Sequence, residues 1–388
     1  MEKMEQKKQE CAKAENVAPA GEEKGKRRKI PWSMLYIVAT IVAVLLFGLF
    51  NREFGNVFRT IANLTPGFLT LGVVVSLVYF LFEGEIFRLL LHSQGYHISV
   101  LEGLKNALLG LYYSYITPSS TGGQPMQSAY LLRDKKIPVG ISTAALIIKF
   151  MCFQCAFVLV SVASFVGMYT KLAAENPGII PFVILGLGIN GCSIVFFASL
   201  FHKPILHQIC RFAKWLMGRF GFLRRRTGLL NSIDRFEADF SSYTDDFKGK
   251  QKSLIAAMLL SIPQFILQMS VIYFIFRAFG YHDVSYLEVL AVQSMLQVSV
   301  SFMPMPGASG AQEIGFSSFF RNYFVNDDLY AAVMVWRFFT YYLVVIAGAI
   351  LVVADQFVYR RKKLREALAS PVAENVEEYK EEGTQDEL

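Results

Sequence analysis

Two basic residues, Lys149 and Arg337, stand inside long apolar segments of this sequence. A basic side chain in hydrocarbon costs on the order of 3 kcal/mol, so such residues usually face a polar interior and a partner. We therefore predict that both residues bind the phosphate of a lipid headgroup that passes through the protein. The alternatives are a structural ion pair with Glu83, Glu85 or Glu313 and, for a lysine, a lone snorkelling side chain.

Proline and glycine interrupt two further apolar segments, at residues 101–136 and 286–324. These residues free backbone groups from the helix ladder, and inside a membrane such groups persist where they line a cavity or are buried in protein. Paired broken segments point to a transporter site. The helix-breaking residues are Pro118, Gly122, Gly123 and Pro125 in the first segment and Pro304, Pro306, Gly307 and Gly310 in the second.

Polar side chains accompany both breaks and complete the predicted substrate-binding set: Ser120, Thr121, Gln124, Ser309, Gln312 and Glu313. Half-helices that begin after Gly122 and Gly310 would direct free N–H groups at an anion. The alternative is that these polar groups only satisfy the broken backbone, and that Glu313 caps the half-helix beside it.

Other chemistry has no support in the sequence. It contains no nucleophile elbow, HExxH motif or P-loop, so we assign no catalytic residue. The five histidines show no metal-ligand spacing, and Cys152 and Cys155 lie in an apolar segment. We expect no metal and no cofactor.

The two broken segments match each other. An offset of 188 residues places Pro118 on Pro306, Gly122 on Gly310 and Gln124 on Gln312, and it also places Lys149 on Arg337. Because the matches include the helix breakers and the intramembrane charge of each half, we predict two structural repeats.

The composition predicts the elements that must position these residues. Of the 388 residues 54% are hydrophobic and only 18% are charged, whereas soluble domains have about 25% charged residues. Six runs are long enough to span a bilayer as helices: 31–50, 65–82, 140–170, 178–201, 253–276 and 329–354. The predicted fold class is an all-α polytopic membrane protein with about six full transmembrane helices.

The number of full spans between the two broken segments determines how the repeats are oriented relative to one another. Three full spans separate the broken segments, and an odd number inverts the second repeat relative to the first. We therefore expect two re-entrant hairpins in inverted repeats, of which the first enters from the cytoplasm. The alternative is that each broken segment crosses fully, which gives eight spans.

Charge distribution predicts the organisation of the chain. Residues 1–29 are a disordered cytoplasmic arm, residues 30–358 a transmembrane domain, and residues 359–388 a basic and then acidic cytoplasmic tail. A basic insert at 202–252 contains a predicted amphipathic surface helix, with a plain cytoplasmic loop as the alternative. The positive-inside rule explains its charge without nucleic acid and places both termini in the cytoplasm.

Three sequence segments carry a resemblance: TPSSTGGQPMQSAYLLRDKKIPV, PMPGASGAQEIGF and WRFFTYY. They resemble the membrane part of the lysylphosphatidylglycerol synthase/flippase family, over residues 30–358. In that family a soluble domain transfers lysine from lysyl-tRNA to phosphatidylglycerol, and the membrane part moves the product to the outer leaflet. The resemblance implies a multi-pass protein of the bacterial plasma membrane and resistance to cationic antimicrobial peptides.

This chain departs from the family pattern after residue 358, where only thirty residues follow. The favoured prediction is therefore a flippase-like lipid translocase whose partner is a membrane phospholipid, anionic or aminoacylated, such as lysyl-phosphatidylglycerol. One alternative is a phosphatidylglycerol lysyltransferase with a separate catalytic partner. The other is a membrane scaffold for a lipid-modifying enzyme.

Overall fold

The computed structural model describes residues 59–219, 227–247, 249–325 and 328–368. Within these ranges every regular element is helical, and five stretches are long and apolar enough to cross a membrane. They are Pro66–His92 (α4), Val139–Glu175 (α7), Pro177–Ser199 (η2 and α8), Gln251–Ala278 (α12) and Asp328–Tyr359 (α15, η4 and part of α16).

These five stretches correspond to five of the six predicted spans, and the all-α polytopic fold is confirmed. The sixth predicted span, at residues 31–50, lies outside the described residues, as do the N-terminal arm and the tail beyond residue 368.

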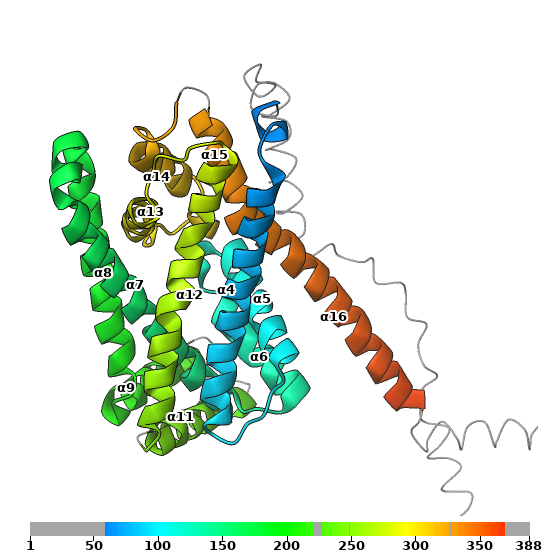
Figure 1. Cartoon of the computed structure of the whole chain (residues 1–388). Coiled ribbons are helices and arrows are strands. Elements are labelled where there is room, and N and C mark those ends of the chain that lie inside the picture. Colours follow the sequence, from blue (N-terminus) through cyan, green and yellow to red (C-terminus); the bar gives the residue numbers. More distant parts are fainter. Residues whose placement is uncertain (1–58, 220–226, 248, 326–327, 369–388) are drawn as a thin grey trace, which may run out of the picture. The chain divides into compact units, whose positions relative to one another are not determined.

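Helices α4 and α12 pack along one another in opposite directions (Figure 1). Where α4 begins and α12 ends, the Thr65 N–H donates to the Ala278 carbonyl oxygen over 3.2 Å. At the other end of the pair, the Lys250 ammonium donates to the Gln94 side-chain oxygen over 3.1 Å. These two contacts place the end of α4 and the end of α12 at opposite ends of the bundle.

Helices α5 (Val100–Ile116) and α6 (Gly123–Lys135) form the first hairpin. Helix α5 begins at a capping box, in which the side chains of Ser99 and Glu102 each accept the other residue's backbone N–H. It ends before Pro118, because a proline disfavours helical backbone in the residue that precedes it. At 17 residues α5 is about 25 Å long, which is shorter than a bilayer core of about 30 Å.

The first hairpin returns to the end of the bundle from which it starts. The side-chain amide of Asn106 donates to the backbone carbonyl oxygen of Gln127 over 3.2 Å. The side-chain amide of Gln127 donates in turn to the backbone carbonyl oxygen of Asn106 over 3.1 Å. Near the open end of the hairpin, Lys135 at the end of α6 forms an ion pair with Glu102 at the start of α5, with 2.5 Å between nitrogen and oxygen. Helix α6 therefore runs back along α5 instead of continuing across.

Helices α13 (Tyr286–Val300) and α14 (Ala311–Phe320) form the second hairpin. The Gln312 amide donates to the Gln297 side-chain oxygen over 3.3 Å near the tip. At the open end the Tyr323 hydroxyl donates to a Glu288 carboxylate oxygen over 2.7 Å. Both broken segments are thus re-entrant, and the alternative of eight spans does not describe this structure.

The two hairpins enter the bundle from opposite ends. The first follows the end of α4 and the second follows the end of α12, and these ends point in opposite directions. The hairpin tips meet inside the bundle, where the Ser119 N–H donates to the Pro304 carbonyl oxygen over 3.2 Å. The inverted arrangement predicted from parity is present.

The backbone repeats at the offset that the sequence indicates. Ser119 and Ser120 have φ values of 53° and 54°, and residues 307 and 308, at the matching positions, have 57° and 48°. Helices α6 and α14 then begin at Gly123 and Ala311, which are also 188 positions apart. The two tips therefore contain the same left-handed turn in two sequences that share few residues there.

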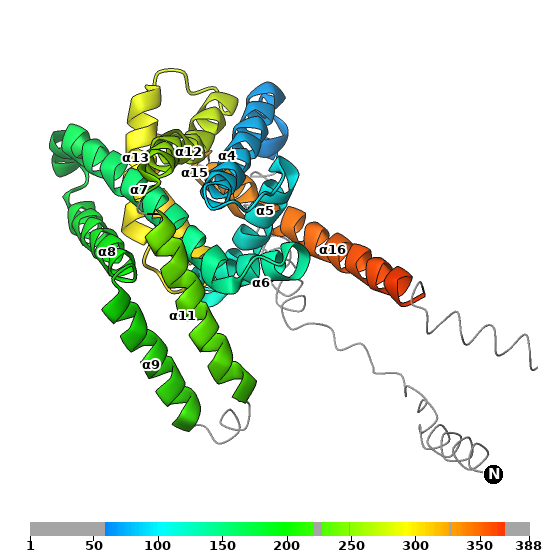
Figure 2. The same ribbon diagram turned by 90° about the horizontal axis from the view of Figure 1, so that it is seen from below.

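The described part of the insert between α8 and α12 contains helices α9 (Lys203–Arg219) and α11 (Thr227–Phe247), seen side by side in Figure 2. An ion pair with Asp234 joins them and raises the pKa of Lys214 above its usual value. Apolar side chains, including Phe212 and Trp215, are exposed on α9, and the location of this helix at the membrane surface stays a prediction.

The last span contains a π-helical turn. Helix α15 (Asp328–Arg337) continues through η4 (Phe338–Tyr342) into α16 (Leu343–Leu368). This turn begins directly after Arg337, and π-helical turns inside helices frequently mark functional sites.

Gly307→Ala is expected to destabilise the protein by on the order of 2–3 kcal/mol. Its left-handed backbone penalises a β-carbon by about 1–2 kcal/mol, and that carbon would lie 2.2 Å from the Tyr341 ring, which must move. The thermal unfolding midpoint of the protein in detergent measures the effect.

Ser119→Gly is the matched control at the equivalent position of the first hairpin. Glycine adopts a left-handed backbone without the strain that a serine side chain adds there, so the unfolding midpoint should stay equal or rise. A large drop for Ser119→Gly, or none for Gly307→Ala, would contradict the shared turn.

Candidate functional site

A cavity of about 760 Å³ lies where the two hairpin tips meet. Both tips line it, together with residues of α7, α8, α12 and α13, the end of α15 at Arg337 and the π-helical turn η4 that follows. These helices are largely apolar, and the cavity brings many of their polar side chains together in the interior of the membrane domain.

Five of the predicted binding residues line this cavity: Ser120, Thr121, Gln124, Gln312 and Arg337. Two more, Ser309 and Glu313, contact Arg337 without lining the cavity themselves. The structure therefore gathers seven of the eight predicted residues, from both repeats, around one place.

Arg337 is buried and held by the second hairpin tip. Its two terminal nitrogens donate to the Gly307 carbonyl oxygen over 3.3 Å and to the Ser309 hydroxyl over 3.0 Å. Its Nε lies 2.8 Å from a Glu313 carboxylate oxygen, an ion pair in which the N–H is not aligned for a hydrogen bond. The guanidinium carbon also lies 4.6 Å from the centre of the Tyr341 ring. These contacts fix the guanidinium at the cavity wall.

Glu313 has two roles at once. One carboxylate oxygen pairs with Arg337, and the other accepts the Gly310 N–H over 2.6 Å, at the start of α14. Both alternatives from the sequence, an ion pair and a helix cap, are therefore present in one side chain. In the first tip the Thr117 hydroxyl takes the capping role and accepts the Gly122 N–H over 2.9 Å.

Lys149 lies outside the cavity lining. Its ammonium forms a buried ion pair with Glu83 of α4. The other oxygen of that carboxylate accepts the Gln264 amide of α12 over 2.5 Å. This network joins three spans and corresponds to the structural ion pair that the sequence left open.

The helix-breaking residues shape the two tips. Pro118 and Pro306 open the short turns η1 (Pro118–Ser120) and η3 (Pro306–Ala308), and Pro304 supplies the carbonyl that joins the tips. Gly123 allows α6 to approach α5, because a β-carbon there would lie 2.1 Å from the Ser114 hydroxyl oxygen. Pro125 and Gly307 line the cavity directly.

Sequence reasoning missed five amide side chains of the cavity lining: Gln154, Asn190, Gln268, Gln293 and Gln297. The signal was present, since these residues interrupt apolar runs and Gln293 and Gln297 lie one helical turn apart. These amides lie away from the helix breakers, and neutral polar side chains cost less to bury than ions, so they give a weaker signal in an apolar segment. Within the described ranges, no three His, Cys, Asp or Glu side chains converge as a metal site would require.

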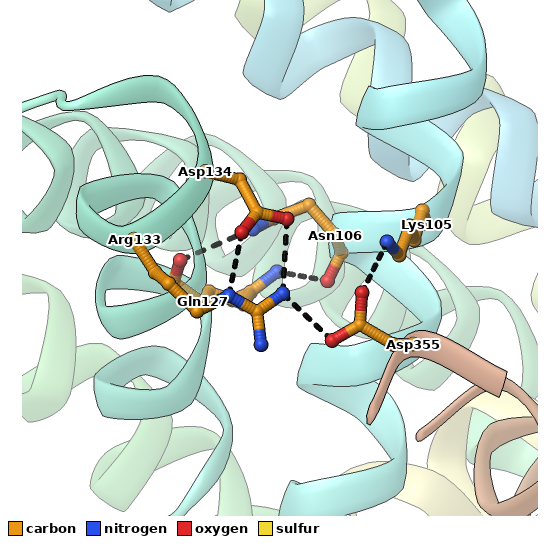
Figure 3. Close-up of polar contacts among 6 residues, drawn as sticks. All are labelled: Lys105, Asn106, Gln127, Arg133, Asp134 and Asp355. Atoms are coloured by element: carbon orange, nitrogen blue, oxygen red, sulfur yellow. Dashed lines mark hydrogen bonds and ion pairs between the residues drawn. The ribbon is translucent and has the colours of Figure 1, made fainter. Parts of the chain in front are cut away.

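A second polar cluster closes the open end of the first hairpin (Figure 3). Asp355 of α16 accepts from Lys105 of α5 over 2.5 Å and from Arg133 of α6 over 2.7 Å. Arg133 also pairs with its neighbour Asp134, over 2.5 and 2.9 Å. One carboxylate on the last helix thus holds both arms of the hairpin together.

The amino-acid sequence of this chain is similar to those of known membrane proteins. Residues 35–348 match the profile of a family described as the lysylphosphatidylglycerol synthase TM region. A "UPF0104 membrane protein" of Methanothermobacter thermautotrophicus is 24% identical over 72% of this chain and 80% of its own length. One from Archaeoglobus fulgidus is 26% identical over 68% of this chain and 79% of its own. No solved structure matches the chain significantly.

Lys149→Met alone is expected to destabilise the protein by about 3–5 kcal/mol, because Glu83 is left as a buried, unpaired carboxylate. The double variant Glu83→Gln, Lys149→Met should recover most of this loss, since a glutamine needs no counter-charge and can still bond Gln264. Thermal unfolding in detergent compares the two. Equal midpoints for the single and double variants would exclude a structural ion pair.

Asp355→Asn is expected to destabilise the protein by about 1–3 kcal/mol, because two charge-assisted hydrogen bonds are weakened together. Asp134→Asn is the matched control, since its carboxylate contacts only the adjacent Arg133 and should contribute less than about 1 kcal/mol. The same unfolding assay tests both, and a larger effect at Asp134 would contradict the role given to Asp355.

Proposed function

The chain belongs to the family of the lysylphosphatidylglycerol synthase transmembrane region, and from this premise we propose that it moves a phospholipid between membrane leaflets. The headgroup passes through the cavity between the two hairpin tips while the acyl chains stay in hydrocarbon. The substrate is an anionic or aminoacylated phospholipid, and Arg337 binds its phosphate.

The observation that carries this proposal is the position of a buried arginine at the wall of a polar cavity, where two hairpins from opposite ends meet. A headgroup that crosses a bilayer must exchange its water shell for other polar groups, or it pays the cost of entering hydrocarbon. A polar cavity lined by both repeats supplies such groups from either side. Inverted repeats with broken helices commonly surround the substrate of a transporter in this way.

Arg337 has the geometry of a phosphate ligand. A guanidinium has five N–H groups, and the hydrogen bonds of Arg337 to Gly307 and Ser309 engage one on each terminal nitrogen, while Nε lies beside the Glu313 carboxylate. One N–H on each terminal nitrogen remains for a phosphate, which arginine binds well in a bidentate manner. Lys149 has no comparable access, and its pair with Glu83 favours a structural role.

Arg337→Gln tests the proposal. We expect at least a tenfold slower exchange of fluorescent phosphatidylglycerol between the leaflets of reconstituted liposomes, because a charge-assisted hydrogen bond is worth about 1.5–3 kcal/mol. Bleaching of the outer leaflet by dithionite measures the exchange.

Arg277→Gln is the matched control, because Arg277 contacts Tyr281 and His282 at the end of α12, away from the cavity lining. Exchange that is equally fast in protein-free and protein-containing liposomes would reject the translocase. Formation of lysyl-lipid from lysyl-tRNA by the same liposomes would favour the transferase alternative, and the absence of both activities would favour the scaffold.

A further inference from the structure

The cavity lining is rich in neutral amides and carries one charge among its described residues. That charge is Arg337, and the amide side chains are Gln124, Gln154, Asn190, Gln268, Gln293, Gln297 and Gln312. An amide side chain has both hydrogen-bond donors and an acceptor, although Asn190 already uses its own on Gln154, Gly186 and Ser301. A hydroxyl group also donates and accepts, so the lining matches a ligand with several hydroxyls.

Two of these amides have a carbonyl oxygen without a donor from the protein. They are the Oε1 atoms of Gln293 and Gln312, in residues that are only 2% and 7% exposed. The nitrogen of Gln312 is used, because it donates to Gln297 over 3.3 Å. An unpaired buried acceptor costs about 1–3 kcal/mol, so a ligand that brings donors to these oxygens, once the amides turn toward the cavity, gains up to that much in affinity.

The remaining capacity of Arg337 calls for an acceptor of opposite charge. Its free N–H groups suit a phosphate, whereas Gln293 and Gln312 suit neutral donors. Aromatic side chains, including Tyr115, Trp336 and Tyr341, supply apolar walls around these polar groups. The combination describes a phosphate ester with a hydroxylated, largely uncharged substituent.

An aminoacylated headgroup fits this lining poorly. Its ammonium groups only donate and carry positive charge, and no carboxylate lines the cavity in the described part of the chain. Glu313 does not compensate, because one of its oxygens pairs with Arg337 and the other accepts from Gly310. A cation in the cavity would face the guanidinium without a counter-charge of its own.

We propose that this cavity selects the phosphate ester of a polyol or sugar, such as an inositol phosphate headgroup, over an aminoacylated one. This inference rests on the proposed function, from which it takes that the ligand is a lipid. It adds which class of headgroup the same site prefers. Gln293 and Gln312 determine the selectivity, and Arg337 holds the phosphate common to both classes.

Equilibrium binding to the full chain in detergent micelles tests the selectivity. Microscale thermophoresis compares phosphatidylinositol, phosphatidylglycerol and lysyl-phosphatidylglycerol, with soluble glycerophosphoinositol as a headgroup without acyl chains. Phosphatidylinositol should bind at least tenfold more tightly than lysyl-phosphatidylglycerol, with phosphatidylglycerol between them.

Two variants test the role of the amides, one by a loss of binding and one by a gain. Gln293→Leu with Gln312→Leu should weaken phosphatidylinositol binding by about tenfold and leave lysyl-phosphatidylglycerol binding unchanged. Gln293→Glu introduces a carboxylate and should invert the preference, a gain that a misfolded protein cannot show. Gln208→Leu, on helix α9 outside the cavity, is the matched control.

The outcomes separate this inference from the proposed function. Equal binding of the two lipids, or no effect of the double substitution, overturns the selectivity even if liposomes show exchange. The expected preference without any exchange supports the selectivity and rejects the translocase. If soluble glycerophosphoinositol binds as tightly as phosphatidylinositol, the result supports the proposed headgroup chemistry. The same result rejects the claim that the ligand must be a lipid.

Discussion

A helix that breaks inside an apolar bundle must find partners for the backbone groups that it frees, and this requirement organises the protein. The two breaks supply hydrogen-bond partners to each other, since the Ser119 N–H donates to the Pro304 carbonyl oxygen. Thr117 and Glu313 take up the N–H groups at the starts of α6 and α14. Thr117 and Glu313 each act within their own hairpin, whereas the Ser119–Pro304 bond joins the two tips and brings their polar groups together in the interior of the membrane domain.

The two buried cations occupy equivalent positions of the repeats and have different surroundings. Lys149 is neutralised by Glu83, with Gln264 on the second oxygen, so its charge is used to join α4, α7 and α12. Arg337 pairs with a carboxylate of its own hairpin and retains access to the cavity. Equivalent sequence positions thus give one ion pair that joins three spans and one cation that lines the cavity, and the cavity is asymmetric although the backbone around it repeats.

Much of this arrangement could be predicted from the sequence. Span positions follow from the length of uncharged runs, and the hairpins follow from Pro118 and Pro306, because breakers leave recognisable gaps in otherwise continuous helices. The inversion follows from counting spans. The partner of Lys149 could not be predicted, since the choice among Glu83, Glu85 and Glu313 depends on helix rotation, which apolar segments without a polar face do not specify. Gln293 and the other amides were missed because glutamine also occurs as an ordinary buried residue.

The π-helical turn at Phe338–Tyr342 has a consequence for the history of the two halves. Helix α7 continues without such a turn after Lys149, whereas the last span accommodates an additional residue directly after Arg337. A duplicated ancestral unit that later gained a single codon here would keep every preceding residue in its inherited register. The insertion would rotate only the residues on its C-terminal side, which include Thr340 and Tyr341 at the cavity wall. Divergence between the halves can in this way be concentrated in one turn of one helix.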